Sequence, residues 1–212
     1  MKKIVFLVLY VFLFFTQPVA FGQIHSTESK PKWNHDLEGW LYLMPDQVIF
    51  SPIYGLDRDW LHLEARYNYE DLNTFSAWFG YNLSGGKNLE YTFTPMLGGL
   101  VGNLNGLSPG LEINLDFHRF NFNSSSQYVF DFKDRTSDFY YNWTDLSYAP
   151  LDWMSFGLSI QRTRLYRSSL DPQFGAMLDF TYRWFELSSY WYNPFRKDPY
   201  FVIALYLSFP EN

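Results

Sequence analysis

The chain has 212 residues, no cysteine and a formal charge of −6 at pH 7. This acidic balance argues against nucleic acid as a partner, because proteins that bind nucleic acids present basic surfaces. The lack of thiols excludes cysteine catalysis and thiolate metal sites. Aromatic residues form 22% of the chain, which is very high for a soluble domain. A membrane barrel uses such residues at its two interfaces with water.

Residues 1–22 have the pattern of a secretory signal peptide. Two lysines precede an apolar run at 4–15, and the sequence AFG at 20–22 supplies small residues for cleavage. The run has about twelve residues, whereas a membrane-spanning helix needs about twenty. No cysteine lies near the cut, which excludes a lipoprotein anchor. We therefore expect a cleaved signal and a mature chain that begins near Gln23.

Residues 23–58 show no clear spanning pattern. Residues 23 to about 36 are polar and aperiodic, which is typical of a flexible periplasmic leader. Residues 37–58 contain the apolar runs WLYL and VIF, separated by Pro45 and Asp46 and followed by Pro52. Both runs are too short to span a membrane. We expect this segment to lie at the mouth of a barrel or to enter it as a small plug.

From Trp60 onward, apolar and polar residues alternate. In residues 61–70 one side of the expected strand reads Leu, Leu, Ala, Tyr, Tyr, and the other reads His, Glu, Arg, Asn, Glu. Successive side chains of a strand point to opposite faces, so one face is apolar and the other is charged. About ten residues at a tilt near 40° rise about 25 Å, the height of a barrel's apolar band. The pattern predicts ten strands, at 60–70, 73–83, 89–98, 109–118, 119–131, 138–149, 152–164, 172–182, 184–193 and 199–209.

A secreted soluble β-sandwich or lipocalin-like barrel would show the same alternation. Two of the expected strands are also weaker, because Ser124, Ser126 and Asn142 fall on their apolar sides. However, the apolar sides carry unusually many bulky Phe, Tyr and Leu residues. The polar sides contain many small residues, as a crowded lumen requires. Both features favour a membrane barrel.

The connections between the expected strands alternate in length. Short turns are expected at 84–87, 118–119, 150–152 and 183, and longer loops at 99–108, 133–137, 167–171 and 194–198. Only the first connection, a tight hairpin at 71–72, departs from this order. Outer-membrane barrels have short periplasmic turns and longer outer loops. Residues 59–212 are therefore predicted to form an all-β, antiparallel transmembrane β-barrel of about ten strands, with eight or twelve as alternatives.

Several segments resemble those of uncharacterised bacterial outer-membrane barrel proteins. They are LHLEARYNYED at 61–71, SAWFGYN at 76–82, YTFTPMLGG at 91–99, YVFDFKDR at 128–135 and QRT at 161–163. The resemblance is to the broad small-barrel class that includes the OmpW-like and porin-like groups. It implies the outer membrane of a Gram-negative bacterium and brings no established activity with it.

The histidines give little support for catalysis. His25 and His35 lie in the expected leader, His118 lies at a short turn, and His62 faces inward near the periplasmic end of its strand. Barrel hydrolases and acyltransferases need a histidine beside a serine or a carboxylate at the outer end. We therefore expect no catalytic residue and no cofactor, although an enzyme that modifies lipid or cleaves protein remains the third alternative. No metal site is expected either, because the acidic residues fall on separate strands without calcium-loop spacing.

The expected lumen is rich in charge. Arg66 should pair with Glu64 or with a carboxylate such as Glu90 or Glu112, and acidic groups outnumber basic ones. The predicted network comprises His62, Glu64, Arg66, Glu70, Glu90, Glu112, Asp116, Asp145, Asp179 and Glu186. Small barrels are usually filled by such networks, which predicts a structural or interaction protein. The alternative is a narrow, weakly cation-selective channel, because acidic rings favour cations.

The expected partners follow from this location. They are the lipids of the outer membrane and the barrel-assembly machinery during insertion. The barrel is expected to be a monomer.

Overall fold

A computed structural model describes residues 32–164 and 171–210 of the protein. The expected signal peptide and its cleavage site lie outside the described residues. Within the described part of the chain, no helix is long and apolar enough to cross a membrane. The described residues form strands, turns and one short 3₁₀ helix, η1 (Arg135–Ser137).

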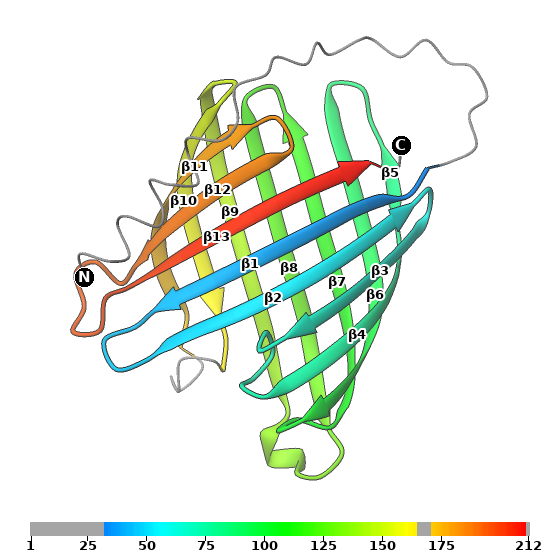
Figure 1. The fold of residues 1–212 in the computed structure, drawn as a ribbon, viewed down its shortest axis with the longest axis vertical. Coiled ribbons are helices and arrows are strands. Elements are labelled where there is room, and N and C mark those ends of the chain that lie inside the picture. The colour runs from blue at the N-terminus through cyan, green and yellow to red at the C-terminus, as the bar shows by residue number, and fades with distance from the viewer. Residues whose placement is uncertain (1–31, 165–170, 211–212) are drawn as a thin grey trace. The chain divides into compact units, whose positions relative to one another are not determined.

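The strands form one antiparallel sheet that closes on itself (Figure 1). Their bounds are β1 (Asn34–Leu43), β2 (Val48–Arg58), β3 (Leu61–Tyr67), β4 (Thr74–Tyr81), β5 (Leu83–Gly85), β6 (Leu89–Gly102), β7 (Gly106–Phe117), β8 (Phe120–Asp131), β9 (Phe139–Leu151), β10 (Met154–Arg162), β11 (Gln173–Tyr182), β12 (Phe185–Tyr192) and β13 (Tyr200–Pro210). Apart from β4 and β5, each strand pairs with its sequence neighbours, and β1 pairs with β13 to close the ring. β4 and β5 both pair with β6 and form one wall strand interrupted at Asn82. The described residues thus form a closed barrel with 12 strands in the ring.

The barrel has two different ends. At one end, which we call the turn end, tight turns at 59–60, 118–119, 152–153 and 183–184 join the strands. Asp59, His118 and Arg183 have positive φ at three of these turns, as tight hairpins require. At the other end, the loop end, the described connections are 44–47, 68–73, 103–105, 132–138 and 193–199, together with residues 163–164 and 171–172 next to β10 and β11. The predicted alternation of short and long connections is present with two departures. The longer loop expected at 99–108 has only three residues, 103–105, as many as the turn at 86–88, and 68–73 is longer than the tight hairpin expected there.

All ten strands predicted from the alternation are present. The predicted number is two too low, since the ring has twelve strands, which was one of the two alternatives. The prediction that residues 37–58 lie at the mouth or form a plug is wrong, because β1 and β2 are full members of the wall. β1 also begins at Asn34, inside the expected leader. Two features hid these strands. Their inward positions include Trp40, Tyr42 and Ile49, so both faces are apolar, and Pro52 suggested a break.

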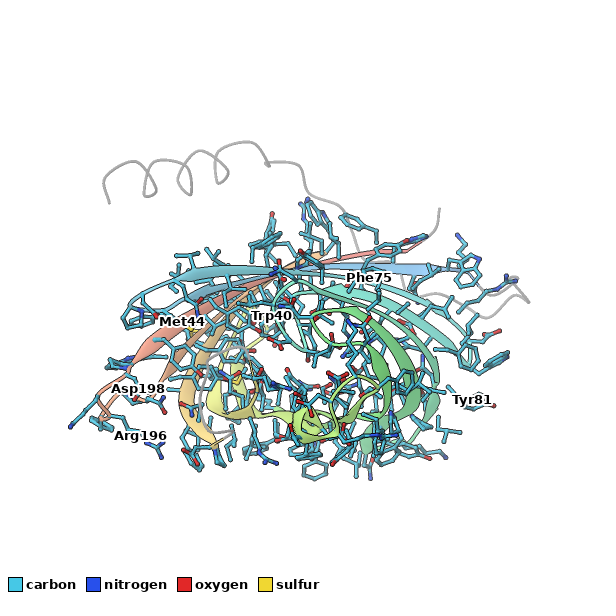
Figure 2. The ribbon with its side chains drawn as sticks, turned by 90° about the horizontal axis from the view of Figure 1, so that it is seen from below. Trp40, Met44, Phe75, Tyr81, Arg196 and Asp198 are labelled. Atoms are coloured by element: carbon cyan, nitrogen blue, oxygen red, sulfur yellow. The ribbon has the colours of Figure 1, made fainter. Side chains whose placement is uncertain are left out.

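The two faces of the wall differ as the alternation requires. On β4, Thr74, Ser76 and Trp78 are buried inside the ring, whereas Phe75 and Phe79 are exposed outside it. Figure 2 looks into the ring and shows Trp40 on its inner side and Tyr81 on its outer side. The outer face is therefore a broad apolar band around a more polar interior.

One polar patch interrupts the apolar outer face on β8 and β9. The Asn142 amide donates to Ser126 Oγ at 2.9 Å and to Thr144 Oγ1 at 3.1 Å. The hydroxyls of Ser124 and Thr144 share a hydrogen bond of 2.8 Å. The residues that weakened the alternation therefore do face outward, and they satisfy one another there.

Candidate functional site

The candidate site is a cavity inside the turn-end half of the barrel. Its volume is about 440 Å³, and it reaches from Asp152 at a turn to Arg66 and Tyr69 in the middle of the lumen. Arg66 is the only lysine or arginine among the described lining residues. The acidic lining residues number seven: Glu38, Glu64, Glu112, Asp145, Asp152, Asp179 and Glu186. The cavity is therefore strongly acidic.

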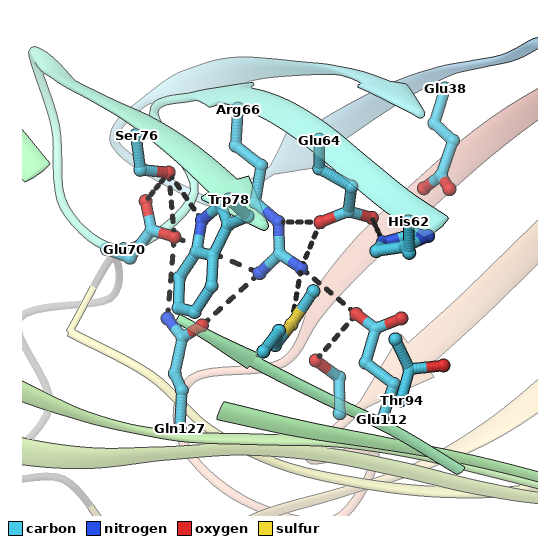
Figure 3. Close-up of polar contacts among 12 residues, drawn as sticks. Glu38, His62, Glu64, Arg66, Glu70, Ser76, Trp78, Thr94, Glu112 and Gln127 are labelled. Carbon is cyan, nitrogen blue, oxygen red and sulfur yellow. Dashed lines mark hydrogen bonds and ion pairs between the residues drawn. The ribbon is translucent and has the colours of Figure 1, made fainter. Parts of the chain in front are cut away.

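Arg66 crosses the lumen and joins opposite walls. It starts on β3, where its Nε donates to Glu64 Oε2 at 2.5 Å. Its Nη2 donates to Glu112 Oε1 on β7 at 3.0 Å, and its Nη1 donates to Gln127 Oε1 on β8 at 3.2 Å. The guanidinium also lies 4.7 Å from the Trp78 ring centroid. The predicted pairing with Glu64 and Glu112 is thus present, and Figure 3 shows these contacts.

Glu70 approaches the same arginine from the loop end. It lies in the connection between β3 and β4, is fully buried and is 3.9 Å from Arg66 Nη1. The Ser76 hydroxyl donates to its carboxylate at 2.9 Å, and the Gln127 amide donates to it at 3.4 Å. Arg66 therefore has three carboxylates around it, and neutral hydrogen-bond donors hold the Glu70 carboxylate in place.

A second acidic group lies on the wall formed by β9 to β12. Asp145 accepts hydrogen bonds from the Trp143 indole at 3.0 Å and the Tyr190 hydroxyl at 3.1 Å. Asp179 accepts from the Ser155 hydroxyl at 2.6 Å. Among the ion pairs of the described residues, none includes these two carboxylates. The carboxylates of Asp145 and Asp179 are therefore hydrogen-bonded to neutral side chains and are not paired with a basic residue among those that the structure describes.

The residues of the predicted network lie in three separate groups. The group around Arg66 contains His62, Glu64, Arg66, Glu70 and Glu112, and the second group contains Asp145, Asp179 and Glu186. Glu90 and Asp116 lie opposite each other near the turn end and are exposed. Glu90 therefore does not pair with Arg66 as expected.

Sequence reasoning missed the contributions of β1 and β2 to the site. Glu38 and Trp40 line the cavity from β1, and the Trp40 indole donates to Glu38 Oε2 at 2.8 Å. Asp57 of β2 contacts His62 Nδ1 at 2.9 Å. The outward residues at 37, 39, 41 and 43 do keep a period of two, and this weak signal could have revealed β1.

The loop-end half of the lumen is packed with side chains. We define the closure zone as Tyr42, Val129, Tyr141, Tyr192 and Val202, all exposed by at most 1%. The Tyr192 ring stacks on Tyr200, with ring centroids 5.1 Å apart. Leu104 enters the same core from the connection between β6 and β7. In the described residues, the lumen is thus open toward the turn end and filled toward the loop end.

Comparisons with known proteins bear on the fold. No protein-family model and no curated protein sequence matches the chain. Among solved structures, KdgM porin in complex with disordered oligogalacturonate is similar, with a TM-score of 0.62 and 12% identity over 82% of this chain and 99% of that one. A second KdgM porin structure has a TM-score of 0.58 and 11% identity over 82% and 99% of the two chains. Omp33 of Acinetobacter baumannii has a TM-score of 0.50 and 10% identity over 85% and 100%. These likenesses support a porin-like β-barrel fold.

Proposed function

We propose that the protein is a bacterial outer-membrane barrel that conducts small cations through a narrow, acidic lumen. The observation that carries this proposal is the cavity, in which seven carboxylates face one arginine. Rings of acidic side chains raise the local concentration of cations and repel anions. The likeness to porins supports a channel rather than an enzyme.

The outer surface supports a position in the membrane. Large apolar side chains such as Leu158, Phe174 and Phe201 are exposed by 67%, 51% and 50% on the outer face. Such a surface is stable in hydrocarbon and costly in water. Exposed aromatic residues mark both borders of the band: Trp60, Trp153 and Trp184 at the turn end, and Tyr128, Tyr140 and Trp191 at the loop end. We assign the turn end to the periplasm, as in outer-membrane barrels generally.

The charge of the lumen argues against an acidic sugar as the permeant. Oligogalacturonate, which is bound in one of the KdgM structures, carries a carboxylate on each sugar. In this barrel such a chain would meet the carboxylates of Glu64, Glu112 and Asp145, among others, with Arg66 already paired. Like charges at short range repel. We therefore propose a pore like that of KdgM porin but a different permeant from oligogalacturonate.

A filled barrel with a structural or interaction role is the second candidate. The closure zone favours it, because side chains from the wall and from three connections fill the loop-end half of the lumen. In that case the acidic cavity is a vestibule that opens only to the periplasm. The channel proposal requires the closure zone to open.

An enzyme receives the least support. The contacts of His62 in the described residues are with Asp57 and Glu64, and a serine nucleophile is not among them. A histidine held between two carboxylates lacks the group that it would have to activate.

Planar-bilayer recording of the purified protein tests the channel. We expect discrete current steps, and a reversal potential in a potassium chloride gradient that shows preference for potassium. Silent bilayers from protein that is folded by its heat-dependent gel mobility would support the filled barrel instead. Anion preference would contradict the argument from the acidic cavity.

A further inference from the structure

His62 has one ring nitrogen that is fixed and one that is buried without a hydrogen-bond partner. Its Nδ1 lies 2.9 Å from Asp57 Oδ1. The same oxygen accepts a hydrogen bond of 2.7 Å from the Asn82 amide. Because Asp57 is the acceptor in both contacts, Nδ1 carries the hydrogen. In the neutral ring, Nε2 then presents its lone pair to the lumen.

The atoms facing this lone pair are carboxylate oxygens. Glu64 Oε1 lies 3.6 Å from Nε2, which is too long for a hydrogen bond, and Nε2 has no hydrogen-bond partner. Glu112 reaches the same place from the opposite wall, and one ligand atom from each of the three residues lies within 4.8 Å of the others. His62 is only 8% exposed. A buried ring nitrogen without a hydrogen-bond partner thus faces two carboxylates, and a metal ion that takes the place of a proton on Nε2 would satisfy all three groups.

We propose that His62, Glu64 and Glu112 bind one divalent transition-metal ion of the Zn²⁺ type. Two ligands at about 2.0–2.2 Å from a tetrahedral ion lie about 3.4 Å apart, close to the 3.6 Å between Nε2 and Glu64 Oε1. The imidazole ligand favours a transition metal over Mg²⁺ or Ca²⁺, which prefer oxygen ligands alone. The cavity leaves room for a water molecule at the remaining coordination position.

Neighbouring side chains hold the three proposed ligands in place. Asp57 holds the His62 ring by its other nitrogen, the arrangement in which a carboxylate orients a metal-binding histidine. Arg66 binds Glu64 Oε2 and Glu112 Oε1, so it fixes both carboxylates while leaving their other oxygens for the ion. Figure 3 shows this grouping, with His62 beside the Glu64 carboxylate and Glu112 approaching both from below.

This proposal departs from the expectation of no metal site drawn from the sequence. That expectation rested on the separation of the acidic residues along the chain. The ring brings β3 and β7 to opposite walls of one lumen, and Arg66 joins their carboxylates across it. Ligands from separate strands can therefore form one site.

The test is calorimetric titration of the purified, chelator-treated protein in detergent with ZnCl₂, and with MgCl₂ for comparison. We expect one Zn²⁺ per barrel, and weak or no binding of Mg²⁺. His62→Gln should remove the binding, and Asp57→Asn should weaken it about 10–100-fold because it loosens the ring. His118→Gln is the matched control, since His118 lies at an exposed turn, and it should bind as the wild type does.

Two further measurements keep the test decisive. Glu112→Gln on the opposite wall should also lose the site, which covers the case in which His62→Gln does not fold. Cobalt(II) should give visible absorption bands of a nitrogen- and oxygen-bound ion in the wild type and not in His62→Gln. A wild type that binds Zn²⁺ no better than Mg²⁺, or a folded His62→Gln that binds Zn²⁺ as well as the wild type, would overturn the proposal.

Discussion

The two halves of the lumen share one wall and differ in what the wall presents. The turn-end half presents carboxylates, with Arg66 as the one basic residue among its described lining. The loop-end half presents Tyr42, Tyr192 and Val202, which are almost completely buried. The same strands run through both halves, so the difference comes from their inward residues and from side chains such as Leu104 that enter from the loop-end connections. The acidic side chains and the closure zone thus occupy different positions along the same strands.

Arg66 lies where the halves meet, and its removal should have the largest effect. Arg66→Ala leaves Glu64, Glu70 and Glu112 without their counter-charge, at a cost of about 3–5 kcal/mol in the free energy of unfolding. Heat-dependent gel mobility measures this loss. The exposed Arg119, whose side chain is 50% accessible at a turn, provides the control, and Arg119→Ala should cost less than about 1 kcal/mol.

Conductance of the same variant separates the two candidate functions. In a channel, Arg66→Ala removes the chief positive charge, so cation current should rise. In a filled barrel the variant melts earlier and stays silent in bilayers. Unchanged melting would contradict the contacts described for Arg66.

Truncation of the closure zone should have the next largest effect. Tyr192 is fully buried and packs between Tyr190 and Tyr200, with ring centroids 5.9 and 5.1 Å away. Tyr192→Ala opens space that water can enter, so its cost should be below the roughly 3–5 kcal/mol of an aromatic residue truncated in a dry core. Single-channel conductance should rise severalfold. Tyr192→Phe keeps the ring and should conduct as the wild type does; equal currents in all three proteins would show that the closure lies elsewhere.

The smallest effect is expected at Asp179 in the cavity. Its Oδ2 accepts from Ser155, and its Oδ1 has no partner. Asp179→Asn removes one of seven lining carboxylates, so the preference for potassium should fall by less than about twofold. Reversal potentials in a salt gradient measure the change. A switch to anion preference would mean that this one carboxylate, and not the group, sets selectivity.

The alternation of residues predicted the wall of the barrel well, because the side-chain period of a strand is a local property. It gave ten strands, the order of short and long connections and the inward direction of Glu64, Glu112 and Asp179. The alternation did not predict β1 and β2, because these strands carry apolar side chains on the inner face of the ring as well as on the outer face. Tyr42 and Ile49 serve that interior.

The site was less predictable than the wall. A strand's pattern tells which face a residue occupies, but not its depth in the lumen or the residue that it meets across it. Glu90 and Glu112 both lie on inward positions, yet Glu90 is exposed near the turn end and Glu112 meets Arg66. The tilt and register of the ring set these depths, and both depend on closure by β1, for which the sequence carries only a weak signal.

The seam between β1 and β13 has a consequence for the order of folding. Asn34 pairs with Pro210 and Leu43 pairs with Phe201, so the last ladder joins the two ends of the described chain. Every other ladder joins sequence neighbours and can form as the chain emerges. A chain that lacks β13 keeps two unpaired strand edges, which hydrocarbon does not tolerate. Because loop entropy disfavours the most distant contacts, we expect closure to be the last step of folding, and a chain truncated before β13 should keep strand edges that are open to aggregation.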